Sequence, residues 1–385
     1  MKERILILLF CIMIILPSIL YIVMPPDKTA AEMENRQMAS GVLDTGETER
    51  GIVAKALDLL TAGGDLSAAV EDVFNDNIPF RGSLIKTNTN LNLSLFHTLG
   101  SNQVVLGKDG WYFYNNETDN SPLKQFALGS SLSEDQLQTV TEQLTKMKDL
   151  AKENGAEFIF LIAPNKPEVY PEYVPDAYRK TSTERIYYQL GAYLSENTEI
   201  TVLLMQDELD KLSPKYTSYF KTDTHWNNLA AFIATQNLAT ATGLQENHIE
   251  LDELEITLTH DSGKDLLNLA GIGDANIDDN QYTIEGFMDE VTTEEWLVNE
   301  IGTRQKVKTN SPNDKKLLMY RDSFAEAMIP YTSKYFSESY YISGYPRDRD
   351  DKSMSQWLAE ENPDIVVFEI VERSLADLPE FLEVD

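Results

Sequence analysis

From residue 133 onward, short apolar runs alternate with stretches in which apolar residues recur at helical spacing. The short runs predict buried strands, and the stretches between them predict helices. Strands that alternate with helices are typical of an α/β domain with a mostly parallel central sheet. The predicted strands are 157–163, 200–205, 316–320, 340–342 and 365–370, and the predicted helices are 133–154, 183–195, 226–240 and a helix from Phe324 onward.

Two regions depart from this alternation. Residues 104–114 predict two short strands around a turn at Lys108-Asp109-Gly110. Residues 245–315 are acidic and have no clear period, so we expect an irregular insertion or cap there. We therefore place the main domain at residues 101–385, and a polar stalk with a helical lead-in at residues 28–100.

The start of the chain is a single apolar stretch. Residues 5–24 contain no charged residue, and a helix of that length spans a hydrocarbon core of about 30 Å. Lys2 and Arg4 precede the stretch, which favours a cytoplasmic N-terminus, and no small-residue cleavage site follows it. We expect residues 1–27 to form a signal anchor, a single transmembrane helix in the cell membrane of a bacterium, with the rest of the chain outside the cytoplasm. A cleaved signal peptide is the alternative.

Composition and charge exclude several classes of protein. Hydrophobic residues make up 42% of the chain, which is enough for a packed core and excludes a mainly disordered protein. The chain has 32 Lys and Arg against 63 Asp and Glu, a formal charge of −31, so it has no basic excess with which to bind nucleic acid. The single cysteine, Cys11, lies inside the apolar stretch, which excludes an internal disulfide and a cysteine metal site.

Of the four histidines, His225 has the sequence context of a catalytic base. Asp223 precedes it by two residues, and a carboxylate there can orient the imidazole and stabilise its charged form. The structural alternative is that Thr222 or Asp223 caps the helix predicted at 226–240, with His225 in the first turn. Of the other histidines, we expect His97 to be packed or hydrogen-bonded, and His248 and His260 to be solvated.

Ser323 is the candidate nucleophile because it follows the strand predicted at 316–320 and precedes a helix. Ligands of parallel α/β sheets bind at that edge, and N–H groups at a helix start can stabilise an oxyanion. The structural alternative is that Ser323 and Glu326 form a capping box. The catalytic interpretations of Ser323 and His225 support each other only if the fold brings the two residues together.

A series of short motifs runs in order through most of the chain, from about residue 32 to residue 375. The motifs are Glu34-Asn35-Arg36, Asn77-Ile78-Pro79-Phe80-Arg81, Gly107-Lys108-Asp109-Gly110-Trp111-Tyr112-Phe113, Ala163-Pro164-Asn165-Lys166 with Val169-Tyr170-Pro171, Thr222-Asp223-Thr224-His225-Trp226, Ser262-Gly263-Lys264-Asp265-Leu266, Arg321-Asp322-Ser323-Phe324, and Phe368-Glu369 with Glu372-Arg373. In their order and spacing they resemble the DHHW-type and AlgJ/AlgX-like family of polysaccharide O-acetyltransferases, within the SGNH-hydrolase-like superfamily.

The resemblance implies an SGNH-hydrolase-like three-layer α/β sandwich with a catalytic triad. In that triad, Ser323 is the nucleophile, His225 the general base and Asp223 the residue that orients the base. The order Asp, His, Ser along the chain is the permuted order of this family. The chain departs from the family in two ways: Arg321 stands where a glycine is usual before Asp-Ser, and nothing resembling the carbohydrate-binding module of the alginate proteins follows residue 375.

The resemblance also implies an activity. A serine activated by His225 would accept an acetyl group and pass it to a hydroxyl of a cell-surface or secreted polysaccharide. No cofactor is expected, and a separate multi-span membrane acyltransferase would supply the acetyl group. Transfer to water instead would make the protein a carbohydrate acetylesterase with the same triad. A third possibility is a non-catalytic scaffold of a polysaccharide assembly complex, in which Ser323 and Asp223 act only as helix caps.

Three further residues are candidates for substrate binding because their motifs follow predicted strand ends: Lys166, Asn165 and Arg373. A surface ion pair or a turn is the structural alternative for each. The acidic surface would repel a polyanion such as alginate, so a neutral or amino-sugar exopolysaccharide or a wall polymer fits better. A metal centre is not expected, because zinc takes at least three protein ligands and Asp223 and His225 are the only close pair.

Overall fold

The computed structural model describes residues 78–382 except 246–247, 261–262, 276, 301 and 345–351, together with residues 10, 16, 24 and 384. Apart from residues 10, 16 and 24, the predicted signal anchor lies outside the described residues, as do Cys11 and residues 28–77 of the predicted stalk. Within the described part of the chain, no helix combines the length and the apolar character needed to cross a bilayer. The chain divides into two compact units, residues 1–101 with 265–275, and residues 102–264 with 276–385.

In the first unit, helix α5 (Arg81–Phe96) packs on the turn that follows α12 (Asp265–Leu269). Thr89 donates from Oγ1 to the carbonyl of Ala270 at 2.7 Å, which ties the two segments together. His97 follows α5 in the left-handed region, with φ of 54°, and its side chain is exposed. We expected His97 to be packed or hydrogen-bonded, and its exposure contradicts the first of these; His248 and His260 are exposed, as predicted.

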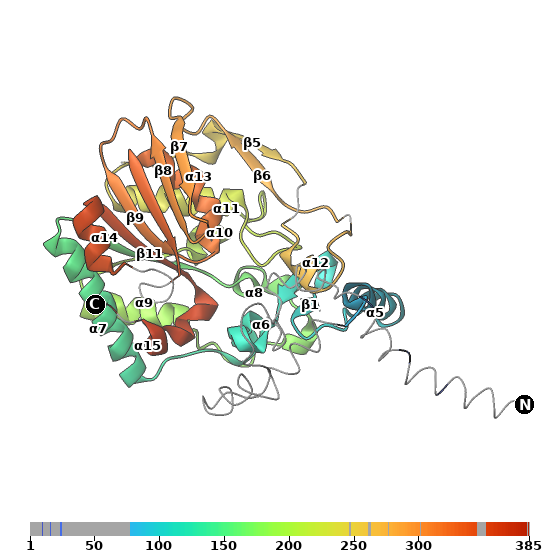
Figure 1. The fold of residues 1–385 in the computed structure, drawn as a ribbon. Helices are drawn as coiled ribbons and strands as arrows, with labels where there is room; N and C mark the ends of the chain where they lie inside the picture. Colours follow the sequence, from blue (N-terminus) through green and yellow to red (C-terminus); the bar gives the residue numbers. More distant parts are fainter. Residues whose placement is uncertain are drawn as a thin grey trace, which may run out of the picture. The chain divides into compact units, whose positions relative to one another are not determined.

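The second unit is built on a seven-stranded mixed sheet in the order β4-β3-β11-β9-β10-β8-β7. The strands from β4 to β10 in that order are parallel, and β8 is antiparallel to both β10 and β7. The predicted α/β class is confirmed, and Figure 1 shows the twisted sheet at the centre of this unit. The strands are β3 (Glu157–Ala163), β4 (Thr201–Leu204), β7 (Thr293–Val298), β8 (Arg304–Thr309), β9 (Lys316–Arg321), β10 (Glu338–Ser343) and β11 (Ile365–Val371).

Two of these strands lie within residues 245–315, the segment expected to be irregular. β7 and β8 form a hairpin that extends the sheet beyond β10, and β5 (Glu255–Leu258) pairs with β6 (Tyr282–Glu285) in a separate ribbon. Every residue of β7 is exposed, and β8 buries only every second residue. An edge hairpin of this kind is largely polar, so it lacks the apolar run that marked the other strands.

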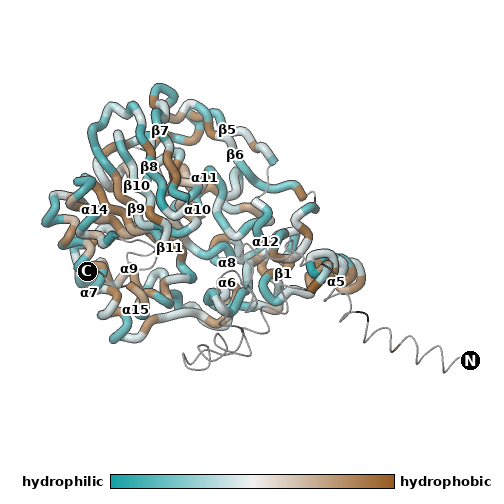
Figure 2. Tube along the Cα trace, viewed as in Figure 1, coloured by the Kyte–Doolittle hydropathy of each residue, from teal (hydrophilic) through white to brown (hydrophobic). Residues whose placement is uncertain are grey.

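Helices cover both faces of the sheet, which makes the three-layer sandwich. Successive side chains of a strand point to opposite faces, so Phe160 of β3 belongs to one apolar core and Leu161 to the other. Figure 2 shows hydrophobic residues along the central strands. The core that contains Phe160 packs against α7 (Glu134–Glu153), α9 (Ile186–Asn197), α14 (Met354–Glu361) and α15 (Leu378–Phe381). The core that contains Leu161 packs against α6 (Pro122–Leu128), α10 (Gln206–Asp210), α11 (Asn228–Ala241) and α13 (Ile329–Thr332).

Shorter elements complete the second unit. The predicted pair of strands at 104–114 is confirmed as β1 (Val104–Leu106) and β2 (Tyr112–Tyr114), which are antiparallel. Helix α8 (Lys166–Val169) follows β3 at the edge of the sheet where the candidate residues gather. The 3₁₀ helices are η1 (Lys108–Gly110), η2 (Glu117–Asp119), η3 (Pro171–Tyr173), η4 (Asp176–Tyr178), η5 (Leu251–Glu253), η6 (Phe324–Met328), η7 (Ser333–Tyr335) and η8 (Glu372–Asp377).

Candidate active site

The two halves of the predicted triad meet at the carboxyl end of the parallel strands. β9 ends at Arg321, and Ser323 directly precedes η6. Asp223 and His225 lie in the loop between α10 and α11, which faces the start of η6. This edge of a parallel sheet is the usual place for ligands, as the sequence analysis expected.

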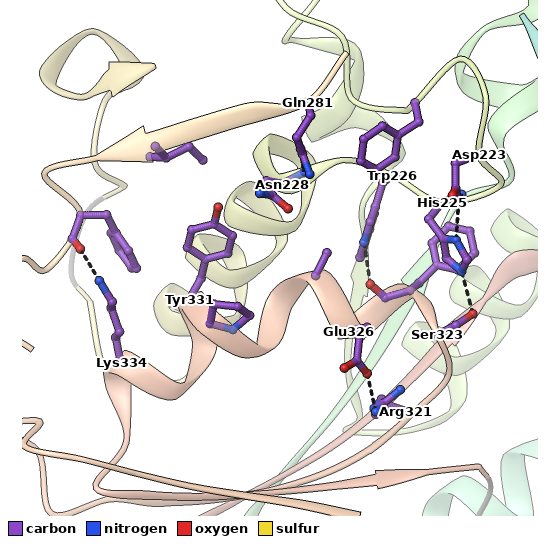
Figure 3. Close-up of a pocket in the computed structure, with 16 residues that line it drawn as sticks. Asp223, His225, Trp226, Asn228, Gln281, Arg321, Ser323, Glu326, Tyr331 and Lys334 are labelled. Atoms are coloured by element: carbon purple, nitrogen blue, oxygen red, sulfur yellow. Dashed lines mark hydrogen bonds and ion pairs between the residues drawn. The ribbon is translucent and has the colours of Figure 1, made fainter. Parts of the chain in front are cut away.

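The side chains of Asp223, His225 and Ser323 form a continuous hydrogen-bonded relay (Figure 3). Asp223 Oδ1 lies 2.6 Å from His225 Nδ1, and His225 Nε2 lies 2.8 Å from Ser323 Oγ. The backbone N–H of His225 also donates to Asp223 Oδ1 at 3.0 Å, which fixes the carboxylate relative to the ring. A hydroxyl, an imidazole and a carboxylate in this order can activate the serine as a nucleophile.

Neither structural alternative holds for these residues. The side chain of Ser323 makes no capping bond: its Oγ is bonded to His225, and the N–H of Glu326 donates to the backbone carbonyl of Ser323 at 3.3 Å. Helix α11 is capped by Asn227, whose Oδ1 accepts two backbone N–H groups, so Asp223 is available to His225. The capping interpretations of Ser323 and Asp223 are therefore wrong.

A tryptophan joins the loop of the base to the segment of the nucleophile. Trp226 is fully buried and donates from Nε1 to the carbonyl of Phe324 at 2.7 Å. The rings of His225 and Phe324 also pack against each other, with centroids 4.9 Å apart. The residues next to the base and next to the nucleophile are thus bonded to each other, which keeps His225 within reach of Ser323.

Lys166 holds the loop that carries Asp223. Its ammonium donates to the backbone carbonyls of Tyr112 at 2.7 Å, Lys221 at 3.0 Å and Asp223 at 2.9 Å, and its side chain is buried. These carbonyls occupy all three of its protons. Lys166 therefore fixes the position of Asp223 through its backbone carbonyl. It does not line the large cavity beside the triad.

Two residues that the sequence analysis did not single out also shape this loop. Asp279 is buried, and its carboxylate accepts the backbone N–H groups of Lys221 and Thr222 as well as the hydroxyl of Thr222. Gly263 lies so close to Asp223 that a Cβ at this position would overlap Asp223 Oδ2. No local pattern could identify Asp279, because its partners are distant in sequence. Gly263 was recognised only as one member of the motif that begins at Ser262.

Asn165 and Arg373 meet Lys166 around a second, much smaller cavity of about 10 Å³, which has room for about one water molecule. Asn165 is buried and donates from Nδ2 to Gln125 Oε1 at 2.9 Å. Arg373 donates from Nε to Asp119 Oδ2 at 3.0 Å. The structure thus brings the three candidate substrate-binding residues together, but in contact with protein groups; their predicted role in substrate binding stays a prediction.

The relay opens at one end of a cavity of about 640 Å³ (Figure 3). Helices η6 and α13 form one wall, and residues of α11 and β6 contribute the opposite one. Burial raises the pKa of Tyr331 in this cavity to about 12, so its hydroxyl stays protonated at neutral pH. The lining is Phe220, Asp223, His225, Trp226, Asn228, Gln281, Ile284, Phe287, Arg321, Ser323, Phe324, Glu326, Ala327, Pro330, Tyr331 and Lys334.

Arg321, the residue that departs from the family motif, is bonded within this cavity. Its guanidinium lies 2.5 Å from Glu326 Oε2, and Glu326 Oε1 accepts a hydrogen bond from Gln305 of β8 at 2.9 Å. Gln305 in turn accepts from Trp296 Nε1 of β7 at 2.9 Å. The antiparallel hairpin that the sequence did not predict therefore reaches the wall of the cavity.

Comparison with known proteins finds a family model that matches part of the chain. Residues 104–295 match the SGNH hydrolase-like domain of the acetyltransferase AlgX, a range that contains Asp223 and His225 and ends before Ser323. The probable alginate O-acetylase AlgJ of Pseudomonas putida is 25% identical over 182 residues, 47% of this chain and 44% of the relative. The corresponding protein of Pseudomonas syringae pv. tomato is 26% identical over 178 residues, 46% and 43% of the two chains. The matched region thus spans less than half the length of these relatives.

A solved structure shares the fold. The DHHW family protein from Eubacterium siraeum aligns with a TM-score of 0.52 and 15% identity, over 73% of this chain and 95% of that chain. At this identity the likeness concerns the fold alone. Together with the sequence relatives, it confirms the resemblance predicted from the motifs.

Proposed function

We propose that this AlgX-like protein of the SGNH-hydrolase-like superfamily is a polysaccharide O-acetyltransferase that works through an acetyl-serine intermediate. The observation that carries the proposal is the relay from Asp223 through His225 to Ser323, at the end of a cavity large enough for sugar residues. The names of the AlgJ relatives support acetylation of a polysaccharide as the reaction class.

In the first half of the reaction, Ser323 takes an acetyl group from an ester donor. Oγ attacks the acetyl carbonyl carbon while His225 Nε2 accepts the hydroxyl proton, and Asp223 stabilises the imidazolium that forms. The bond between the carbonyl carbon and the donor oxygen then breaks. The leaving oxygen takes the proton from His225, which leaves acetyl-Ser323 and a neutral imidazole.

In the second half, a hydroxyl of the polysaccharide takes the place of the donor. His225 accepts its proton as the oxygen attacks the acetyl carbon, and the bond to Ser323 Oγ breaks. The proton returns to Oγ. The products are the acetylated sugar and the free enzyme, so no cofactor is consumed.

The acceptor would lie in the cavity beside the relay. Phe220, Phe287 and Tyr331 offer aromatic faces for a sugar ring, while Asn228 and Gln281 offer polar groups. The ion pair between Arg321 and Glu326 neutralises both charges near Ser323. With a chain charge of −31, this lining favours a neutral or amino-sugar polymer over a polyanion.

We also propose the setting of the reaction. The apolar stretch at residues 5–24 would anchor the protein in the cell membrane with the catalytic unit outside the cytoplasm. A multi-span membrane acyltransferase would deliver the acetyl groups, since acetyl donors of the cytoplasm do not reach that side of the membrane.

The test is acetylation of Ser323 from an activated acetyl ester by the purified full-length chain. We expect intact mass and peptide mapping to find one acetyl group on Ser323, and to find none in Ser323→Ala or His225→Ala. Asp223→Asn should retain the fold but react about 10³–10⁴-fold more slowly, because the imidazole loses its orienting partner. A folded wild-type protein that remains unacetylated would contradict the mechanism and favour a scaffold role.

The esterase alternative differs only in the acceptor. Candidate glycans added to the acetylated protein should remove the acetyl group faster than buffer does, and the glycan should gain 42 Da for each acetyl group, the mass of C₂H₂O. Release of acetate at the same rate with and without glycan would identify an acetylesterase.

A further inference from the structure

Two carboxyl groups, those of Asp322 and Glu369, lie next to the turn that carries the nucleophile. Glu369 is in β11, one residue after Phe368, which pairs with Tyr320 of β9. Its side chain has 0% exposure, within a strand whose other residues are apolar. A carboxyl buried in this way is costly unless it makes compensating bonds. The proposed mechanism gives it no role.

The bonds of this pair lead to the turn that carries Ser323. Glu369 Oε2 accepts the backbone N–H of Asp322 at 3.1 Å. The carboxylate of Asp322 accepts the N–H of Val371 at 2.7 Å through Oδ2, and the N–H of Phe324 at 2.7 Å through Oδ1. The residues on both sides of Ser323 are therefore fixed, and both connections to β11 pass through Asp322.

We propose that Glu369 is a positioning residue for the nucleophile, which together with Asp322 fixes the turn of Ser323 to β11. This inference rests on the proposed function. The bond from Ser323 Oγ to His225 Nε2 is 2.8 Å, and a shift of about 1 Å in such a site costs about 10²-fold in rate. The central strand β11 cannot move without breaking its pairing with β3 and β9, so it is a rigid support for this turn.

The charge state of the pair gives the inference a specific test. Burial raises the pKa of Glu369 well above its ordinary value, and the negative charge of Asp322 raises it further. Arg321 is the other charged group that faces Glu369, and it opposes the shift; on the β3 side the neighbour is the apolar Leu161. Burial and the charge of Asp322 both favour the un-ionised form of the Glu369 carboxyl, which a glutamine reproduces in shape and charge.

The experiment compares Glu369→Gln with Glu369→Ala in the full-length chain. Two rates are measured: turnover of a soluble acetyl ester, and labelling of Ser323 by a sulfonyl fluoride, which reports nucleophile reactivity without an acceptor. We expect Glu369→Gln to stay within about 3-fold of wild type in both, and Glu369→Ala to lose at least about 10-fold in kcat and labelling, with KM within about 2-fold. Gln236→Ala, a buried side chain of α11 away from the cavity lining, controls for a general loss of stability.

The pH profile separates positioning from a structural role. As the pH rises, ionisation of Glu369 next to Asp322 should lower the activity of wild type, and Glu369→Gln should lack this loss. A loss with rising pH that is the same in Glu369→Gln as in wild type, or a Glu369→Ala protein that labels at the wild-type rate, would overturn the inference. If Glu369→Ala does not fold, the pH profile of Glu369→Gln still decides.

The outcomes also separate this inference from the proposed function. If Ser323 is labelled in wild type but no glycan is acetylated, the proposed acceptor chemistry fails while the positioning role stands. If Ser323 of the folded wild type does not react with either reagent, both fail.

Discussion

Lys166 carries its charge into the interior of the protein to bind backbone oxygens. An ammonium is expensive to bury unless its three protons are satisfied, and here the carbonyls of Tyr112, Lys221 and Asp223 satisfy them. The three carbonyls come from two distant segments, so one side chain joins β2 to the loop of the triad. The precision of the relay therefore depends on a residue that does not line the large cavity beside the triad.

We predict that Lys166→Met lowers kcat by about 10–100-fold and also lowers the melting temperature. Methionine has a similar length but donates no hydrogen bond, so three buried carbonyls lose a partner, at about 1–3 kcal/mol for each one that remains unsatisfied. Initial rates and thermal unfolding measure the two effects. Lys146→Met, an exposed lysine of α7, is the control. Unchanged kcat in Lys166→Met would contradict the role assigned to this side chain.

At the scale of elements, the pairing of β8 with β10 is stabilised by a charged cluster. Glu338 of β10 lies 3.2 Å from Lys306 Nζ and 3.1 Å from Lys308 Nζ, both on β8, and accepts from the Tyr340 hydroxyl at 2.6 Å. Burial by itself would raise the pKa of Glu338, but the hydrogen bonds from Tyr340, Lys308 and Lys306 outweigh it and lower the pKa to about 2. The cluster fixes the hairpin whose Gln305 reaches the cavity.

This cluster predicts a pH-dependent stability. Because the folded-state pKa of Glu338 is about 2 and its ordinary value is 4.5, its contribution is fully present above pH of about 5 and is lost as the pH falls toward 2. Glu338→Gln should therefore melt at a lower temperature than wild type at pH 7, and the difference should shrink through this window. Melting temperatures at several pH values measure it, with Glu153→Gln on the exposed side of α7 as the control. A difference that is constant with pH would contradict the assignment.

The elements also show which parts of the fold the sequence could predict. Helix 133–154 was predicted within one residue, because its apolar positions recur at helical spacing and face the sheet. The capping-box pattern failed at Ser323 and Glu326, where the serine side chain binds His225 and Arg321 binds the glutamate. A local pattern does not record which partner the folded chain brings to a side chain.

The candidate site was predictable where its residues are local in sequence. Asp223 and His225 share one loop, and the motif around Ser323 follows a clear strand. Asp279 and Glu369 were not identified as functional, because each acts through partners that only the folded chain brings near. The hairpin β7–β8 was missed for a different reason, since its outward side chains are polar.

At the scale of the whole molecule, the proposed attachment of the protein to the cell membrane can be tested directly. The full-length chain should sediment with bacterial membranes, and a variant without residues 1–27 should not, because only those residues supply a stretch long enough to cross the hydrocarbon core. Cell fractionation and protease accessibility of intact cells measure this. Recovery of the protein in the soluble fraction, shortened at its N-terminus, would instead support a cleaved signal peptide.

The order of strands in the sheet has a consequence for how the protein matures. β11 follows the other six strands of this sheet along the chain, yet it lies between β3 and β9. Until it inserts, the sheet consists of two separate ladders, one that contains β3 and β4 and one that contains β9 and β10 with the serine turn. The turn of Ser323 would thus gain its bonds to β11 only after this strand has been synthesised and has inserted between β3 and β9.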